Sequence, residues 1–169
     1  MKYLLFTVAF FLFVFSGMAQ EDKEHDPSQE NEYHHCLFKK NSLSFGPAVT
    51  YSFPLNAAGI NSRLYYNIGE RICFGPEFAY LKKGEETIYD FNFMGHFIFE
   101  TKIIGIYPLI GANYTIEKNH GETDEAFGLV FGGGFHRNFN WITVFAEYSH
   151  IESRLRDDFA TLGFMINLK

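Results

Sequence analysis

The stretch of sequence that decides the fold class is Leu43-Ser44-Phe45-Gly46-Pro47-Ala48-Val49-Thr50-Tyr51-Ser52-Phe53. Large apolar side chains and proline occupy the odd positions, and serine, glycine, alanine and threonine occupy the even ones. Because successive side chains of a β-strand point to opposite faces, this alternation predicts a strand with one large apolar face and one small or polar face.

The same period of two recurs along the rest of the chain, for example in residues 89–99, 127–136 and 160–168. It predicts strands of about 10–14 residues, the length that a tilted strand needs to cross a bilayer. We expect eight of them, near 42–54, 60–68, 72–83, 86–99, 103–116, 125–137, 140–151 and 158–168.

These strands predict an all-β fold, a closed eight-stranded antiparallel up-and-down transmembrane β-barrel. Backbone groups in lipid must all be paired, so the sheet has to close without an edge. The small face then suits a narrow, packed interior, and the large face suits lipid. The alternative is a soluble, lipocalin-like barrel with the aromatic faces turned inward, but that would crowd phenylalanine and tyrosine into one small interior.

The connections predict which end of the barrel is which. Tight turns are expected at 69–71, 101–102 and 138–139. Mostly longer loops are expected at the other end, at 55–59, 84–85, 117–124 and 152–157. Short turns inside and longer loops outside are typical of outer-membrane barrels, so both termini are expected in the periplasm.

The first 41 residues differ from the rest. Lys2 precedes an apolar run over 4–15, and a small-residue ending follows, so residues 1–19 are predicted to be a secretory signal peptide cleaved after Ala19. A retained anchor is the alternative, although the run is short for a membrane-spanning helix. Residues 20–41 are polar and are expected to form a flexible periplasmic leader, which leaves 42–169 for the barrel.

Composition narrows the class of protein. Loss of the one lysine in residues 1–19 takes the basic residues from 14 to 13, against 20 acidic ones. This balance argues against nucleic acid as a partner. The mean hydropathy of −0.10 excludes a helical membrane protein. The aromatic content of 19% is high for a soluble domain and suits the lipid face of a barrel.

Four segments carry a resemblance to a known family, and they lie in order across residues 42–169. They are Phe74-Gly75-Pro76-Glu77-Phe78, Phe131-Gly132-Gly133-Gly134-Phe135, Phe145-Ala146-Glu147-Tyr148 and Leu162-Gly163-Phe164-Met165-Ile166-Asn167-Leu168. The chain resembles the outer-membrane β-barrel domain family, small barrels typified by outer-membrane proteins A and X, in the porin-family version of Bacteroidetes-type bacteria. The resemblance implies a monomer in the outer membrane that binds membrane lipids and uses the barrel-insertion machinery.

Strand parity also predicts a polar network in the lumen, made of Arg63, Glu77, Asp90, His96 and Glu147. A three-residue turn at 69–71 places Arg63 opposite Glu77, and a guanidinium is a good partner for a buried carboxylate. The network either selects ions, as in channels, or plugs a closed barrel. Eight strands leave an interior just wide enough for side chains, which favours the plug.

Three other motifs predict little chemistry. The glycines at 132–134 lack the lysine and helix of a phosphate loop, so they are interpreted as part of the barrel wall. Ser149 and His150 suggest a hydrolytic triad with Glu147, but neighbours on a strand point to opposite faces. His34-His35-Cys36 is too small a ligand set for a metal site and is interpreted as solvated leader. No catalytic, metal or cofactor residue is assigned.

The only cysteines are Cys36 and Cys73. Both are expected at the periplasmic rim, where disulfides form, and the residues between Cys36 and the first strand could span two strand spacings. A disulfide would pin the leader across the barrel floor. Two unpaired thiols are the equal alternative, since a bridge needs close Cα atoms.

Three functions follow from these predictions. The first is a structural or surface-interaction role in the cell envelope. The second is a narrow channel for small solutes. The third, an envelope lipid-modifying enzyme, is the weakest because the catalytic geometry is missing.

Overall fold

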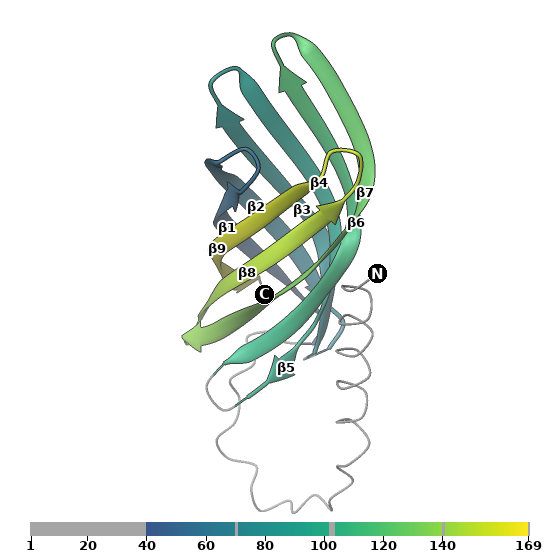
Figure 1. Ribbon diagram of the computed structural model, residues 1–169. Coiled ribbons are helices and arrows are strands. Elements are labelled where there is room, and N and C mark those ends of the chain that lie inside the picture. Colours follow the sequence, from purple (N-terminus) through teal and green to yellow (C-terminus); the bar gives the residue numbers. More distant parts are fainter. Residues whose placement is uncertain (1–39, 70, 102–103, 140, 169) are drawn as a thin grey trace, which may run out of the picture. The chain divides into compact units, whose positions relative to one another are not determined.

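The computed structural model describes residues 40–69, 71–101, 104–139 and 141–168. Nearly all of them form antiparallel strands (Figure 1). The strands are β1 (Ser42–Ser52), β2 (Ala57–Asn67), β3 (Ile72–Lys83), β4 (Glu86–Phe97), β5 (Phe99–Glu100), β6 (Gly105–Asn119), β7 (Glu122–Phe139), β8 (Ile142–Glu152) and β9 (Asp157–Leu168). No helix in these ranges is both long and apolar enough to cross a membrane.

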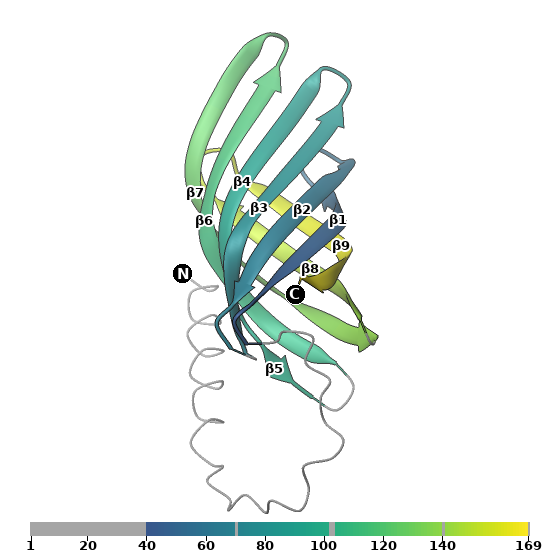
Figure 2. The same cartoon turned by 180° about the vertical axis from the view of Figure 1, so that it is seen from behind.

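The sheet closes on itself. Each strand pairs with its neighbours in sequence, and β1 pairs with β9, from Leu43 opposite Leu168 to Ser52 opposite Phe159. The short β5 continues β4 beyond Ile98, and both pair with β6, so the wall has eight strand positions. At the break, the Ile98 N–H donates to the carbonyl of Arg71 at 2.7 Å. The chain is therefore a closed eight-stranded antiparallel barrel (Figure 2).

The two faces of the wall follow the predicted parity. Even-numbered Ser44, Thr50 and Ser52 of β1 are buried inside, whereas Phe45 and Val49 face out. Outward phenylalanines of other strands are also exposed, including Phe93 at 55%. These phenylalanines face outward, so they do not form the inward-facing aromatic core that a lipocalin-like barrel would need.

The prediction of long loops at one end of the barrel is wrong. The connections at the end away from the termini cover 53–56, 84–85, 120–121 and 153–156, and those at the terminal end cover 68–71, 101–104 and 140–141. Both ends therefore have tight connections. The predicted turn at Asn138-Phe139 lies inside β7, so this connection falls two residues later than expected.

The largest difference lies at 117–124, where an eight-residue loop was predicted. Strand pairing instead continues to Asn119 opposite Glu122, and only His120 and Gly121 form the turn. Both have positive φ, 49° and 86°. This is the backbone of a two-residue turn whose twist matches that of paired strands, so the ladder continues up to the turn. The hydrophilic residues 117–124 therefore belong to two paired strands and a tight turn, not to an irregular loop.

Candidate functional site

The centre of the barrel interior is the guanidinium of Arg63, which is only 2% exposed. Strand β2 directs this side chain inward, and Glu147 of β8 meets it from across the barrel. Nη1 donates to Glu147 Oε2 at 2.8 Å and Nη2 to Oε1 at 2.6 Å. This bidentate pairing matches the guanidinium fork to the carboxylate and links two strands that are not neighbours in the sheet.

We call Arg63, Glu147 and the buried side chains in contact with them the cluster, and Glu77 is its second carboxylate. The register places it opposite Arg63, as the turn count predicted, and its Oε2 lies 3.4 Å from Arg63 Nη2. Tyr65 donates its hydroxyl proton to Glu77, and Asn61 Nδ2 donates to it at 3.4 Å. Arg63 therefore holds Glu147 more closely than Glu77, and neutral groups supply most of the hydrogen bonds to Glu77.

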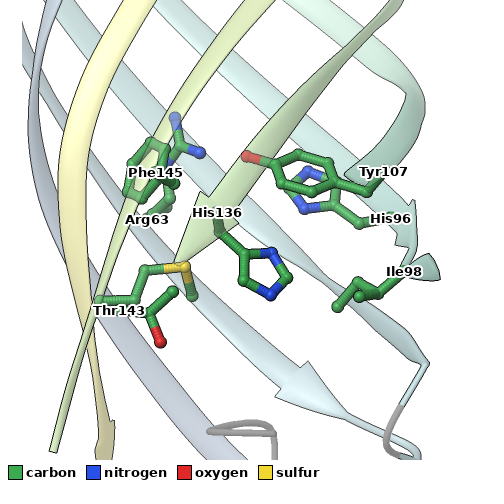
Figure 3. Close-up of a pocket in the computed structure, with 8 residues that line it drawn as sticks. Arg63, His96, Ile98, Tyr107, His136, Thr143 and Phe145 are labelled. Carbon is green, nitrogen blue, oxygen red and sulfur yellow. The ribbon is translucent and has the colours of Figure 1, made fainter. Parts of the chain in front are cut away.

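Aromatic rings line the cluster on its terminal side (Figure 3). The His96 ring stacks on Tyr107 with centroids 5.0 Å apart, and Tyr107 stacks on His136 at 5.8 Å. The Tyr107 hydroxyl donates to Glu147 at 3.1 Å, and His136 Nε2 lies 2.9 Å from Glu100. The stack thus leads from the buried ion pair towards the terminal rim.

His136 fits because its neighbour across the ladder is a glycine. A Cβ on Gly105 would lie 2.3 Å from the His136 ring, so any larger residue there would collide with it. Phe145 packs on the other side of the cluster, with Arg63 Cζ 4.3 Å from the ring centroid. The small cavity between these groups has room for about one water molecule.

The structure brings four of the five predicted lumen residues together. Arg63, Glu77, His96 and Glu147 are linked directly or through Tyr65 and Tyr107. Asp90 is also buried, but its hydrogen bonds go to Asn113 and Thr115. It belongs to a separate polar group on β4 and β6.

Sequence reasoning missed three members of the cluster: Tyr65, Tyr107 and His136. Parity was the available signal for all three, since Tyr65 lies two residues beyond Arg63 on the same face. The Arg63–Glu147 contact had no such signal. It joins β2 to β8 across the lumen, and ladder register relates only strands that are side by side.

The remaining sequence motifs do not form reactive sites among the described residues. Ser149 points inward, whereas His150 lies on the outer face with its Nδ1 2.7 Å from Asp158, so the two do not meet. The glycines at 132–134 lie within β7, which continues as a strand to Phe139. In the described ranges no three histidine, cysteine or acidic side chains gather as metal ligands.

Cys73 is buried on β3 opposite Asn67. Cys36, His34 and His35 lie outside the described residues, as do the predicted signal peptide and most of the leader. The disulfide, the signal peptide and the leader all stay predictions.

The arrangement can hold charge and fill space. One guanidinium lies between two carboxylates inside the closed sheet, and the three side chains come from strands β2, β3 and β8. Ion pairs of this kind are costly to break, because removal of one partner leaves a buried charge without compensation. The arrangement therefore suits a brace or a barrier.

Neither a protein-family model nor a curated protein matches the chain. Solved structures do match. The N-terminal β-barrel domain of Pseudomonas aeruginosa OprF is 13% identical, with a TM-score of 0.67, over 76% of this chain and 98% of that one. Ail, the attachment invasion locus protein of Yersinia pestis, is 17% identical, with a TM-score of 0.55, over 75% and 97%.

A designed protein is similar to the same extent. A de novo transmembrane β-barrel matches at 11% identity with a TM-score of 0.54, over 77% of this chain and 98% of the design. At such identities the likeness is one of fold. The chain has the fold of the small eight-stranded barrels found in outer membranes.

Proposed function

We propose that this protein is an integral barrel of a bacterial outer membrane with a structural or surface-interaction role, and that its lumen is closed. The observation that carries the proposal is the Arg63–Glu147 ion pair, which crosses the interior from β2 to β8 with side chains 1% and 4% exposed. The apolar outer face supports the membrane location. The even number of strand positions puts both termini at one end of the barrel, and that end is proposed to face the periplasm. The proposed role is not enzymatic.

A conducting pore needs a continuous path for hydrated ions, and the Arg63–Glu147 pair crosses the interior where such a path would run. Eight strands leave space for side chains only. Here that space holds a guanidinium, two carboxylates and the rings of Tyr65, Tyr107 and Phe145. The cavity beside them, lined by Arg63, His96 and His136 among others, has room for about one water molecule. A narrow channel is the second candidate function, and it would require this pair to open.

The test is single-channel conductance in planar bilayers. We expect no unitary conductance steps from the wild-type barrel. We expect small steps from the Arg63→Ala, Glu147→Ala double variant, which lacks the ion pair that crosses the interior. Arg71→Ala is the matched control, because Arg71 is exposed at the terminal rim. Wild-type steps that disappear or change size on replacement of Arg63 would establish the channel instead.

The membrane location has a separate test. The protein should fractionate with detergent-extracted outer membrane, and its mobility on gels should change on boiling, as a stable barrel unfolds. A freely soluble monomer would contradict the proposal.

A further inference from the structure

The wall of the barrel is uneven at the end away from the termini. Strand β7 pairs with β6 from Glu122 onward, but with β8 only from Leu129, which lies opposite Glu152. The segment Glu122–Gly128 therefore has a strand partner on one side only among the described residues, and on its other side the 153–156 connection contacts it at Glu125 and Gly128. Figures 1 and 2 show the β6–β7 hairpin rising past the β8–β9 hairpin. We call this segment the open edge of β7.

The hairpin register tells which backbone groups the open edge presents. Asn119 and Glu122 flank the two-residue turn and form a hydrogen-bonded pair. Alternate residues of an antiparallel strand bond to the same neighbour, so Thr123, Glu125 and Phe127 direct their N–H and C=O groups away from β6. The carbonyl of Glu125 accepts a hydrogen bond from Arg154 at 3.1 Å, as this alternation requires.

The guanidinium of Arg154 lies beside the open edge, at a position that suits a cation. It comes from the 153–156 connection, and its Nη2 also donates to Asp124 Oδ1 at 3.1 Å. Its side chain is 63% exposed and that of Asp124 is 56% exposed. Exposed ion pairs hold weakly, so another cation can take the place of Arg154.

The side chains of the open edge combine negative charge with one apolar contact. Glu122, Asp124 and Glu125 are acidic, and the edge has no basic residue of its own. Phe127 is 82% exposed, the highest value among the exposed large hydrophobic side chains, and it packs on Tyr114 with centroids 4.6 Å apart. An added strand with lysine or arginine next to an apolar residue would match both features.

We propose that the open edge of β7 binds an extended basic segment of another protein as an added β-strand. Addition of a strand to an exposed edge is a general mode of peptide recognition, in which backbone hydrogen bonds provide affinity and side chains provide specificity. A second copy of this chain is a poor occupant. Antiparallel pairing of two such edges sets carboxylates opposite carboxylates, and like charges in direct opposition destabilise a sheet. The inference rests on the proposed surface-interaction role and names its partner.

The experiment uses the folded full-length protein in lipid nanodiscs and two synthetic peptides, one alternating lysine with valine and one alternating glutamate with valine. Fluorescence anisotropy should show saturable binding of the lysine peptide and at least tenfold weaker binding of the glutamate peptide. Thr123→Pro removes an N–H that faces the edge and leaves the bonds to β6, so the affinity should fall at least tenfold. Thr123→Ala keeps that N–H and should bind as the wild type does.

Arg154→Ala frees Asp124 and the Glu125 carbonyl, so it should bind the lysine peptide about threefold more tightly. Arg156→Ala removes a similarly exposed arginine that pairs with Glu152 and should leave the affinity unchanged. In the unaltered protein, the peptide should slow amide hydrogen exchange at Thr123, Glu125 and Phe127, but not at Phe145. This last measurement needs no variant to fold.

Equal affinity for the two peptides, or unchanged exchange at the three edge amides, would overturn the proposal. So would binding in detergent that is lost in nanodiscs, since lipid would then cover the edge. Heat-modifiable gel mobility of the same samples separates the two proposals. A barrel that shows the mobility shift but binds no lysine peptide removes only the edge inference, whereas absence of the shift removes the membrane barrel itself.

Discussion

The middle of this barrel and its end away from the termini hold their charges in opposite ways. Midway along the strands, Arg63 and Glu147 form an ion pair with side chains 1% and 4% exposed, on strands β2 and β8 that each pair with two others. At the end away from the termini, Arg154 and Asp124 form a pair that is 63% and 56% exposed, beside a strand that has lost one strand partner. The first pair joins an arginine to a glutamate and the second joins an arginine to an aspartate, both at hydrogen-bond distance.

The two pairs join the same kinds of charged group and differ in their exposure to solvent, so burial decides whether such a pair is fixed or exchangeable. A buried pair stays together, because no water is present to solvate either charge if its partner moves away. An exposed pair contributes little to stability, since water and salt screen it. The first kind can brace a barrel, and the second can exchange partners.

Removal of the buried guanidinium should have the largest effect. Arg63→Met leaves Glu147 and Glu77 in the lumen without a cation and should lower the free energy of unfolding by about 3–5 kcal/mol. Urea titration of the barrel in lipid vesicles, followed by tryptophan fluorescence, measures it. Arg71→Met is the exposed control and should change stability by less than about 0.5 kcal/mol. Similar losses for both variants would show that burial does not decide how much an arginine contributes to stability in this barrel.

On the outer face, the cost of introducing a charge should depend on how deep the residue lies in the membrane. Phe93 lies near the middle of β4, and Phe93→Arg should cost about 2–4 kcal/mol, as a cation does at the bilayer midplane. Phe127 belongs to the open edge of β7, away from the middle of the strands, so Phe127→Arg should cost about 1 kcal/mol or less. The same titration compares the two, with Asn92→Arg, which points to the lumen, expected to be milder than Phe93→Arg. Equal costs for Phe93 and Phe127 would place the membrane elsewhere on the barrel.

Within the buried cluster, the two carboxylates should differ. Glu147→Gln loses two charge-assisted hydrogen bonds from Arg63 and should cost about 1.5–3 kcal/mol. Glu77→Gln loses one long contact and removes the second negative charge, so its cost should stay below about 1 kcal/mol. Double-mutant cycles with Arg63→Met should give larger coupling for Glu147 than for Glu77. A larger coupling for Glu77 would make the neighbour in register, not the partner across the lumen, the true counter-ion.

The smallest effect is expected at the open edge. Arg154→Ala breaks only the exposed pair with Asp124 and one bond to the Glu125 carbonyl. It should change the free energy of unfolding by less than about 0.5 kcal/mol. A loss of 2 kcal/mol or more, as typical of buried networks, would show that the 153–156 connection is part of the barrel's fixed structure and is not free to exchange partners.

Local alternation of side chains was enough to determine the strands, their faces and the inward direction of Arg63, Glu77, Asp90, His96 and Glu147. These properties depend on the two-residue period of a strand, which the sequence carries in every segment. The register of Arg63 opposite Glu77 also followed, because it depends on one tight turn between neighbouring strands. The length of the β6–β7 hairpin did not follow. Its hydrophilic end resembles a loop, and only the positive φ of His120 and Gly121 makes it a continued ladder.

Closure of the sheet decided the rest. The pairing of Arg63 with Glu147 is a contact across the lumen, between strands that are not neighbours in the sheet. Such contacts depend on strand tilt and on the stagger of the whole barrel, which no single hairpin specifies. The open edge of β7 likewise exists because two neighbouring hairpins end at different heights, a relation between segments that only the assembled wall contains.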